Sequence, residues 1–144
     1  MMSIRPEKSY LKGREAGLFA ALLITDFLLK IIVSDSHNAY CNPNGPWGMN
    51  VGADVFLALS GVALVSTVGV GYLFRDEIPR LAFILILAGG IGNILDRLFY
   101  GCVRDYSLVP GFPAFNTADI MLTIGVVLFV RPLFKKKWAE THVI

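Results

Sequence analysis

Charged residues are scarce in this sequence. They make up 17% of its 144 residues, whereas 55% are apolar, and the mean hydropathy is +0.61. A soluble domain has about 25% charged residues spread along the chain, so this composition excludes an ordinary soluble domain and indicates a small integral membrane protein. The apolar runs are continuous and do not alternate with period two, which excludes a transmembrane β-barrel.

Cysteine is equally rare. Cys41 and Cys102 offer no metal-ligand spacing and no disulfide framework, and the sequence leaves open whether they pair. We expect both to be small buried apolar residues. The sequence also lacks internal repeats and a small-residue cleavage site behind its basic N-terminus, so we expect the first apolar run to be a retained helix. No feature offers a site for a metal or a nucleotide, and we expect no cofactor.

Four apolar stretches lie at about 16–33, 55–74, 81–100 and 117–133. Each is near the ~20 residues that a helix needs to cross the hydrocarbon layer. They predict an all-α membrane protein with four transmembrane helices, forming a single domain over residues 1–144, with an outer loop region that can contain a small β element. Glycines cluster in the third stretch, where we expect close helix packing, because a phosphate loop would need a preceding strand.

Lysine and arginine are distributed unevenly between the two ends of these helices. Ten of the 13 lie before the first stretch, between the second and third, or at the end of the fourth: Arg5, Lys8, Lys12, Arg14, Arg75, Arg80, Arg131, Lys135, Lys136 and Lys137. The positive-inside rule makes that side cytoplasmic, with both termini inside. Lys30, Arg97 and Arg104 lie near the opposite face, each close in sequence to an aspartate. Charges that break the rule usually have a partner or a function.

Polar side chains gather near that opposite face in the first and third stretches. Asp26 and Lys30 are four residues apart, so they share a helical face and can pair. A stabilising ion pair and a direct functional role are both open for them. Asn93, Asp96 and Arg97 fall at i, i+3 and i+4 and form a polar stripe toward the bundle interior. For Asp96, an anchoring role and a chemical role both remain open.

Asp105 and Asp119 flank the loop between the third and fourth stretches. Asn116 is a good N-cap and Asp119 occupies the capping-box position, so capping alone can explain Asp119. Asp105 has no helix to cap, although it can be solvated or pair with Arg104. Two carboxylates held close at a half-buried site cannot both ionise easily, so one retains a proton. Such a pair can supply a base for water and an acid for a carbonyl or leaving amine.

Several motifs occur in order along the chain. They are "DFLLK" in the first stretch, "NPNGPWG" in the first outer loop, "GNILDR" and "GCVRDY" at the end of the third stretch, and "FPAFNTAD" opening the fourth. Together, from Asp26 to Asp119, they resemble the motif set of the lipoprotein signal peptidases, also called signal peptidase II. The four-helix topology with both termini inside is similar as well.

The resemblance implies an aspartic endopeptidase of the bacterial plasma (inner) membrane. Such an enzyme removes the signal peptide from prolipoproteins, cutting before a cysteine that carries a diacylglyceryl group. Its implied partners are this substrate and membrane lipid, with no nucleic acid and no obligate protein partner, and its active site is at the outer face. The implied catalytic dyad is Asp105 and Asp119. The implied substrate-binding or supporting residues are Asn93, Arg97, Asn116, Asp26, Lys30, Asn42 and Trp47.

The chain departs from the family pattern at a few positions. Phe27 and Leu29 stand where the family has polar residues, Asn44 stands in place of a loop glycine, and the segment between the two aspartates is several residues shorter. Two other classes of protein remain as alternatives. One is a small proton- or ion-coupled carrier, favoured by intramembrane charges, and the other is a non-catalytic membrane scaffold, favoured by the glycine-rich third stretch.

Overall fold

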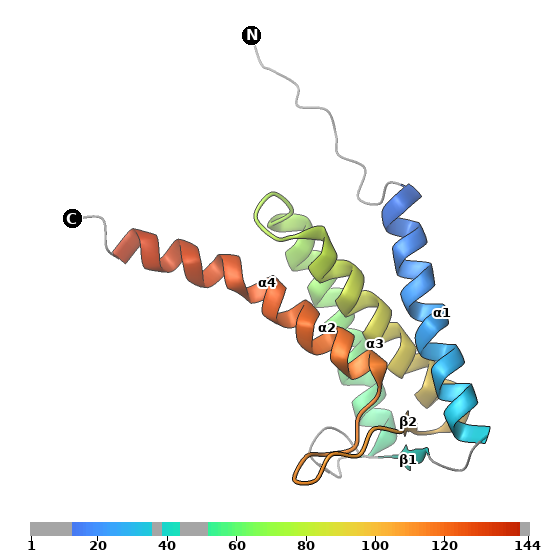
Figure 1. Ribbon diagram of the computed structural model, residues 1–144. Helices are drawn as coiled ribbons and strands as arrows, with labels where there is room; N and C mark the ends of the chain where they lie inside the picture. The colour runs from blue at the N-terminus through green and yellow to red at the C-terminus, as the bar shows by residue number, and fades with distance from the viewer. Residues whose placement is uncertain (1–12, 36–38, 44–51, 142–144) are drawn as a thin grey trace.

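The computed structural model describes residues 13–35, 39–43 and 52–141, which fold into four helices and a two-stranded sheet (Figure 1). In chain order the elements are α1 (Gly13–Asp35), β1 (Tyr40–Asn42), α2 (Ala53–Leu73), α3 (Arg80–Tyr100), β2 (Val103–Asp105) and α4 (Thr117–Thr141). Each helix overlaps one of the predicted apolar stretches. The sheet lies at one end of the helices, and α1 begins and α4 ends away from it (Figure 1).

Helices α1, α2 and α3 are each long and apolar enough to cross a membrane. Most side chains of α1 and α2 are exposed, among them apolar ones such as Ile32, Val65 and Leu73. In a membrane protein these side chains face lipid rather than water. The prediction of a mainly helical membrane protein with a small β element is therefore confirmed, while the fourth membrane span remains a prediction.

Helix α3 is the buried centre of the molecule and packs against the other three helices. Gly89 lies against the backbone oxygen of Ala118 and the side chain of Leu122, and Gly90 lies against Leu64. A Cβ atom at either glycine would overlap these neighbours. The small residues therefore allow α3 to approach α4 and α2 closely, as the sequence predicts.

The end of α3 delivers the chain to the sheet. Gly101 has a φ of 72° and donates its N–H to the backbone oxygen of Arg97. This left-handed conformation suits glycine, which has no Cβ, and it ends the helix. The chain then enters β2, so that Asp105 follows the end of the helix after only a short turn.

Strands β1 and β2 pair antiparallel, with Tyr40 opposite Asp105. A disulfide joins Cys41 in β1 to Cys102 just before β2. The expectation that both cysteines are simply buried apolar residues is wrong, because they are bonded and Cys41 is exposed. Nothing local in the sequence indicates this pairing, since it depends on two strands that meet only in the folded protein.

Candidate active site

Asp105 and Asp119 line the same cavity, at the sheet end of the helices. Asp105 is the last residue of β2, and Asp119 lies in the first turn of α4. The cavity has a volume of about 520 Å³ and is also lined by Asn42, Asn93 and Arg97. Five of the predicted site residues, which come from four different elements, are therefore brought together.

The start of α4 holds Asp119 through a capping box. The side-chain oxygen of Asn116 accepts the N–H of Asp119 at 3.1 Å, and Oδ2 of Asp119 accepts the N–H of Asn116 at 3.0 Å. The capping interpretation of Asp119 is thus confirmed. The capping box occupies only Oδ2 of the carboxylate. Oδ1 accepts a hydrogen bond from Asn93, and the side chain remains half-buried at the cavity.

Two amide groups bind the carboxylate of Asp105. Asn116 donates its Nδ2 to Oδ1 at 2.8 Å, and Asn42 donates its Nδ2 to Oδ2 at 3.0 Å. Burial raises the pKa of Asp105 to about 6, although the hydrogen bonds from Asn42 and Asn116 act in the opposite direction and the nearby Asp119 adds to the rise. The protonated form of Asp105 is therefore accessible near neutral pH. Asn116 contacts both carboxylates and couples them structurally.

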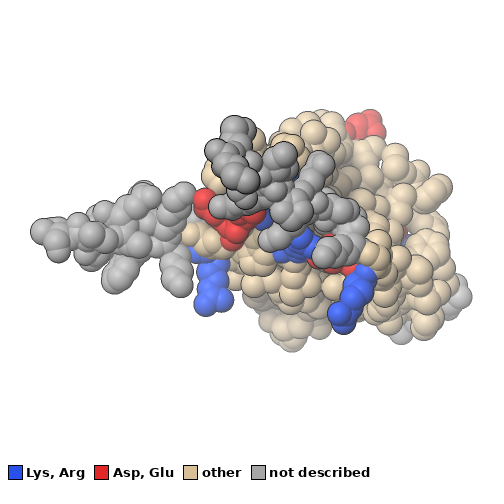
Figure 2. Space-filling model, turned by 90° about the horizontal axis from the view of Figure 1, so that it is seen from above, with Lys and Arg blue, Asp and Glu red and all other residues tan. Residues whose placement is uncertain are grey.

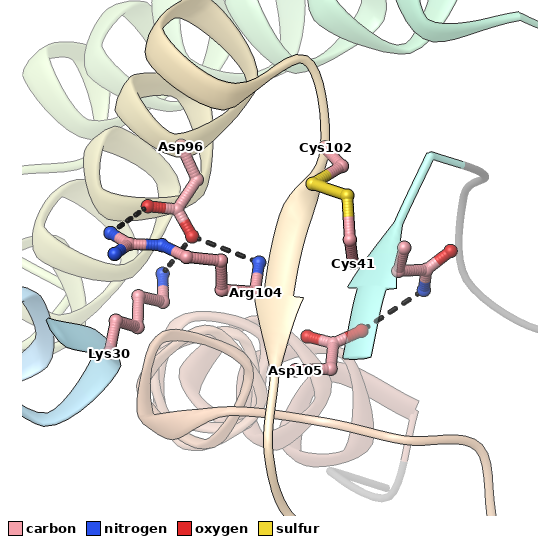
Figure 3. The surroundings of a disulfide bond; sticks show 7 residues. Lys30, Cys41, Asp96, Cys102, Arg104 and Asp105 are labelled. Carbon is pink, nitrogen blue, oxygen red and sulfur yellow. Dashed lines mark hydrogen bonds and ion pairs between the residues drawn. A yellow bond between two sulfur atoms is a disulfide. The ribbon is translucent and has the colours of Figure 1, made fainter. Parts of the chain in front are cut away.

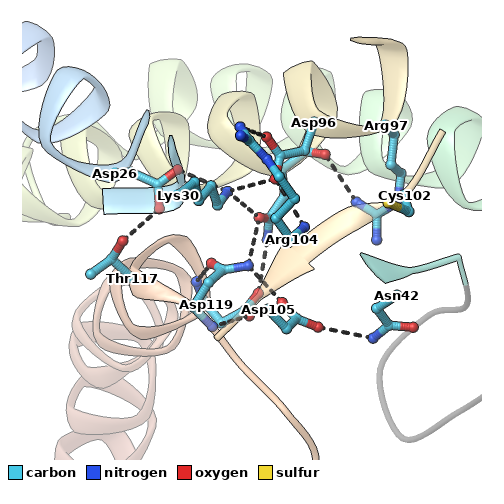
Figure 4. A network of polar contacts seen from close by, with 12 residues as sticks. Asp26, Lys30, Asn42, Asp96, Arg97, Cys102, Arg104, Asp105, Thr117 and Asp119 are labelled. Atoms are coloured by element: carbon cyan, nitrogen blue, oxygen red, sulfur yellow. Dashed lines mark hydrogen bonds and ion pairs between the residues drawn. The ribbon is translucent and has the colours of Figure 1, made fainter. Parts of the chain in front are cut away.

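Asn93 connects Asp119 to a buried ammonium group. Its Oδ1 accepts from Nζ of Lys30 at 3.0 Å and from Nδ2 of Asn116 at 3.2 Å, and its Nδ2 donates to Oδ1 of Asp119 at 2.8 Å. The two donors on one side fix which way the amide points. Lys30 is fully buried. In this structure it therefore contacts Asn93 from the protein interior and supports the site indirectly (Figure 4).

A network of four buried charges lies behind the cavity. Lys30 pairs with Asp26 at 2.8 Å and with Asp96 at 3.3 Å, and the guanidinium of Arg104 pairs with Asp96 at 2.8 Å. The i,i+4 pairing of Asp26 with Lys30 is confirmed. Asp96 points toward α1 and β2 and forms an ion pair with Arg104 (Figure 4). Asp96 is therefore not paired with Arg97, and Arg104 is not paired with Asp105.

Arg97 lies on the cavity side of α3. Its guanidinium donates to the backbone oxygen of Asn93 at 3.3 Å and lies 5.9 Å from the ring centroid of Phe56. It is close enough to Asp105 and Asp119 to interact electrostatically with both. It therefore places a partly exposed positive charge beside the two carboxylates.

Comparison with known proteins gives this arrangement a family. Residues 18–135 match the family described as Signal peptidase (SPase) II. The chain belongs to the signal peptidase II family. It is 38% identical over 97 residues to the lipoprotein signal peptidase of Thermodesulfovibrio yellowstonii, covering 62% of this chain and 66% of that protein. It is 35% identical over 104 residues to the lipoprotein signal peptidase of Latilactobacillus sakei, covering 67% and 68%.

The fold is also similar to that of a bacterial membrane enzyme of known structure. The structure of a bacterial membrane enzyme solved at 2.3 Å resolution superposes with a TM-score of 0.74 and 26% sequence identity, covering 92% of this chain and 94% of that one. The matched region thus spans about two thirds of each of these two lipoprotein signal peptidases and nearly all of the solved chain.

Two side chains outside the predicted site residues, Thr117 and Tyr106, also belong to the candidate site. Thr117 donates its hydroxyl to Oδ1 of Asp26 at 2.6 Å and accepts from the hydroxyl of Tyr106 at 2.9 Å. These contacts tie the start of α4 to α1 and to the residue after Asp105. Thr117 follows the N-cap Asn116, which is the one local signal that could have identified it.

The remaining predicted residue is Trp47, which lies outside the described residues. Within the part of the chain that the structure describes, no group of three or more His, Cys, Asp or Glu side chains could hold a metal ion. Beyond its polar residues, the cavity has an apolar wall formed by the loop before α4 and by the first turns of that helix. This wall includes Phe112, Pro113, Ala114, Phe115, Ile120, Leu122 and Ile124.

Proposed function

We propose that this chain is an aspartic endopeptidase that removes the signal peptide from diacylglyceryl-modified bacterial prolipoproteins, cutting before the lipidated cysteine. The observation that carries the proposal is the pair Asp105 and Asp119, which line one cavity and are joined by Asn116. Membership of the signal peptidase II family supports the substrate class. The carrier and scaffold alternatives draw no support from these relatives.

The two carboxylates are assigned different roles. Asp105 holds the one proton that the pair of carboxylates retains, because burial raises the pKa of Asp105 to about 6. Asp119 acts as the base and takes a proton from a water that attacks the scissile carbonyl carbon, while Asp105 donates its proton to the carbonyl oxygen. The tetrahedral intermediate then collapses as Asp119 returns its proton to the leaving amine and Asp105 recovers a proton from the hydroxyl.

The cavity wall suits a lipidated substrate. Ile120 and Ile124 lie on the exposed face of α4 and line the same cavity as the carboxylates. Acyl chains attached to the cysteine can therefore stay in the bilayer along this apolar face while the peptide bond reaches the dyad. Arg97 and Asn93 provide polar groups for the peptide beside the bond that is cut.

The topology follows the same reasoning. All four helices span the membrane, both termini are cytoplasmic, and the sheet and cavity lie at the outer face. The ten Lys and Arg residues support this orientation. Figure 2 views the end of the molecule opposite the sheet, where basic side chains project from the surface beside acidic ones. The disulfide adds support at the opposite end, because such bonds persist in oxidising compartments and are rare in the cytosol.

The test is cleavage of a diacylglyceryl-modified prolipoprotein by purified variants in detergent. Asp105→Asn and Asp119→Asn should each lower the cleavage rate by about 10²-fold or more while leaving the protein folded, since one carboxyl cannot serve as both acid and base. Asp54→Asn is the matched control, because this carboxylate is exposed at the start of α2 and should leave turnover unchanged. Near-normal turnover by either dyad variant would remove that residue from the mechanism.

A further inference from the structure

Strand β1 carries Asn42, whose side chain reaches Asp105 of the dyad. The strand is short. It has three residues and pairs with β2, which is equally short. A two-stranded sheet is marginally stable without further support. The position of Asn42, the residue of β1 that donates to Asp105, therefore depends on what else fixes the strand.

The disulfide supplies that support at the adjacent residue. Cys41 precedes Asn42 directly, and its bond to Cys102 brings the two Cα atoms to 5.5 Å (Figure 3). Successive side chains of a strand point to opposite faces, so the disulfide holds one face of β1 while Asn42 reaches from the other. The register places Cys41 opposite Arg104 and Asn42 opposite Val103, two residues before Asp105.

Strand β2 has a separate attachment to the helices. The backbone N–H of Arg104 donates to Oδ2 of Asp96 at 3.0 Å, and its guanidinium donates to Oδ1 at 2.8 Å (Figure 3). Asp96 belongs to α3 and also pairs with Lys30 of α1. Asp105 is therefore held by this anchor and by Asn116, whereas the disulfide ties the strand that carries Asn42 to the residue before β2.

We propose that the Cys41–Cys102 disulfide positions Asn42 on the catalytic carboxylate, so that the enzyme with a reduced Cys pair cuts its substrate more slowly. This inference rests on the proposed peptidase function. Cys41 and Cys102 are positioning residues, since neither needs to touch the substrate. A hydrogen bond to a charged group is strong enough that its loss changes a rate by about 10-fold or more. This factor sets the loss that we expect in kcat.

Reduction provides a specific perturbation. Dithiothreitol gives up two thiol hydrogens and two electrons and becomes a cyclic disulfide, while Cys41 and Cys102 each gain an S–H group. The chain contains no other cysteine, so the reductant has a single target in the enzyme. The thioether that joins the diacylglyceryl group to the substrate cysteine is not reduced by a thiol.

The experiment compares oxidised and reduced full-length enzyme on a synthetic diacylglyceryl lipopeptide across pH, measuring kcat and KM separately. We expect kcat to fall about 10-fold or more with a smaller change in KM. The alkaline limb of the profile should also move to higher pH. The N–H of Asn42 lowers the pKa of Asp105, so its loss raises that pKa, while Asn116, Asp119, Lys30 and Arg97 still face the carboxyl from the other elements.

Two variants separate positioning from general stabilisation. Asn42→Ala keeps the disulfide and should reproduce both the loss of kcat and the shift of the alkaline limb. Adding dithiothreitol to Asn42→Ala should then change little, because the contact is already absent. The double variant Cys41→Ser, Cys102→Ser should behave like the reduced enzyme and should not respond to dithiothreitol.

Distinct results overturn distinct claims. A reduced enzyme with unchanged kcat and an unchanged alkaline limb would overturn this inference alone. So would a loss on reduction that is equally large in Asn42→Ala, because the disulfide would then act independently of that side chain. An oxidised wild-type enzyme that leaves the lipopeptide intact would instead overturn the proposed function.

Discussion

Asp96 is the carboxylate on which two buried cations converge. It accepts from Arg104 through both the guanidinium and the backbone N–H, and it pairs with Lys30. Removing one partner of a buried ion pair costs about 3–5 kcal/mol, because a charge is left uncompensated. We expect Asp96→Asn to lower the free energy of unfolding by an amount near the lower end of that range.

The groups that remain explain this magnitude. Lys30 keeps Asp26 at 2.8 Å, and Arg104 keeps the ring of Tyr100 with its guanidinium carbon 4.0 Å from the centroid. An asparagine at position 96 can still accept the backbone N–H of Arg104. The loss is nevertheless large, because among the described residues the buried Nε of Arg104 already has no hydrogen-bond partner.

The assay is unfolding in a fixed detergent, titrated with SDS and followed by circular dichroism. Asp54→Asn is the control, since an exposed aspartate in the first turn of α2 contributes only about 0.3–1 kcal/mol through the helix dipole. An effect of Asp96→Asn no larger than that of Asp54→Asn would refute the reasoning. If stability were unchanged while activity alone was lost, Asp96 would belong to the chemistry instead.

Further predictions concern packing, pH and topology. Gly89→Ala should lower the free energy of unfolding by about 1–3 kcal/mol, because the added methyl overlaps the backbone of Ala118, whereas Gly61→Ala, which has open space around it, should be neutral or stabilising. Equal effects of the two substitutions would contradict the packing of α3. The rate of lipopeptide cleavage should fall as pH rises through the pKa of Asp105, about 6, because the acid loses its proton. A rate that stays constant through that pH would argue against Asp105 as the acid. A reporter that is active only outside the cytoplasm should be inactive when fused to the C-terminus, and an active fusion would overturn the topology.

Features determined by short-range physics could be predicted from the sequence. The helices follow from apolar runs long enough to cross a membrane, and the pairing of Asp26 with Lys30 follows from the helical repeat. The capping box of Asn116 and Asp119 depends only on residues three apart.

Features that depend on distant segments could not. The sequence pattern predicts one polar stripe that includes Asp96 and Arg97, but these are successive residues, and successive helical residues point in different directions. Asp96 therefore turns toward Lys30 and Arg104, while Arg97 turns toward the cavity. The disulfide joins residues separated by 61 positions, and no local pattern indicates that β1 and β2 pair.

The most direct test of the central claim is to identify the bond that the purified protein cuts. A diacylglyceryl-modified prolipoprotein peptide and the same peptide without lipid are each incubated with wild-type enzyme and with Asp105→Asn, and the products are identified by mass spectrometry. The account predicts a product that begins with the lipidated cysteine, formed only from the lipidated peptide and only by the wild-type enzyme. Cleavage at another bond, equal cleavage of the unlipidated peptide, or the same product from Asp105→Asn would contradict it.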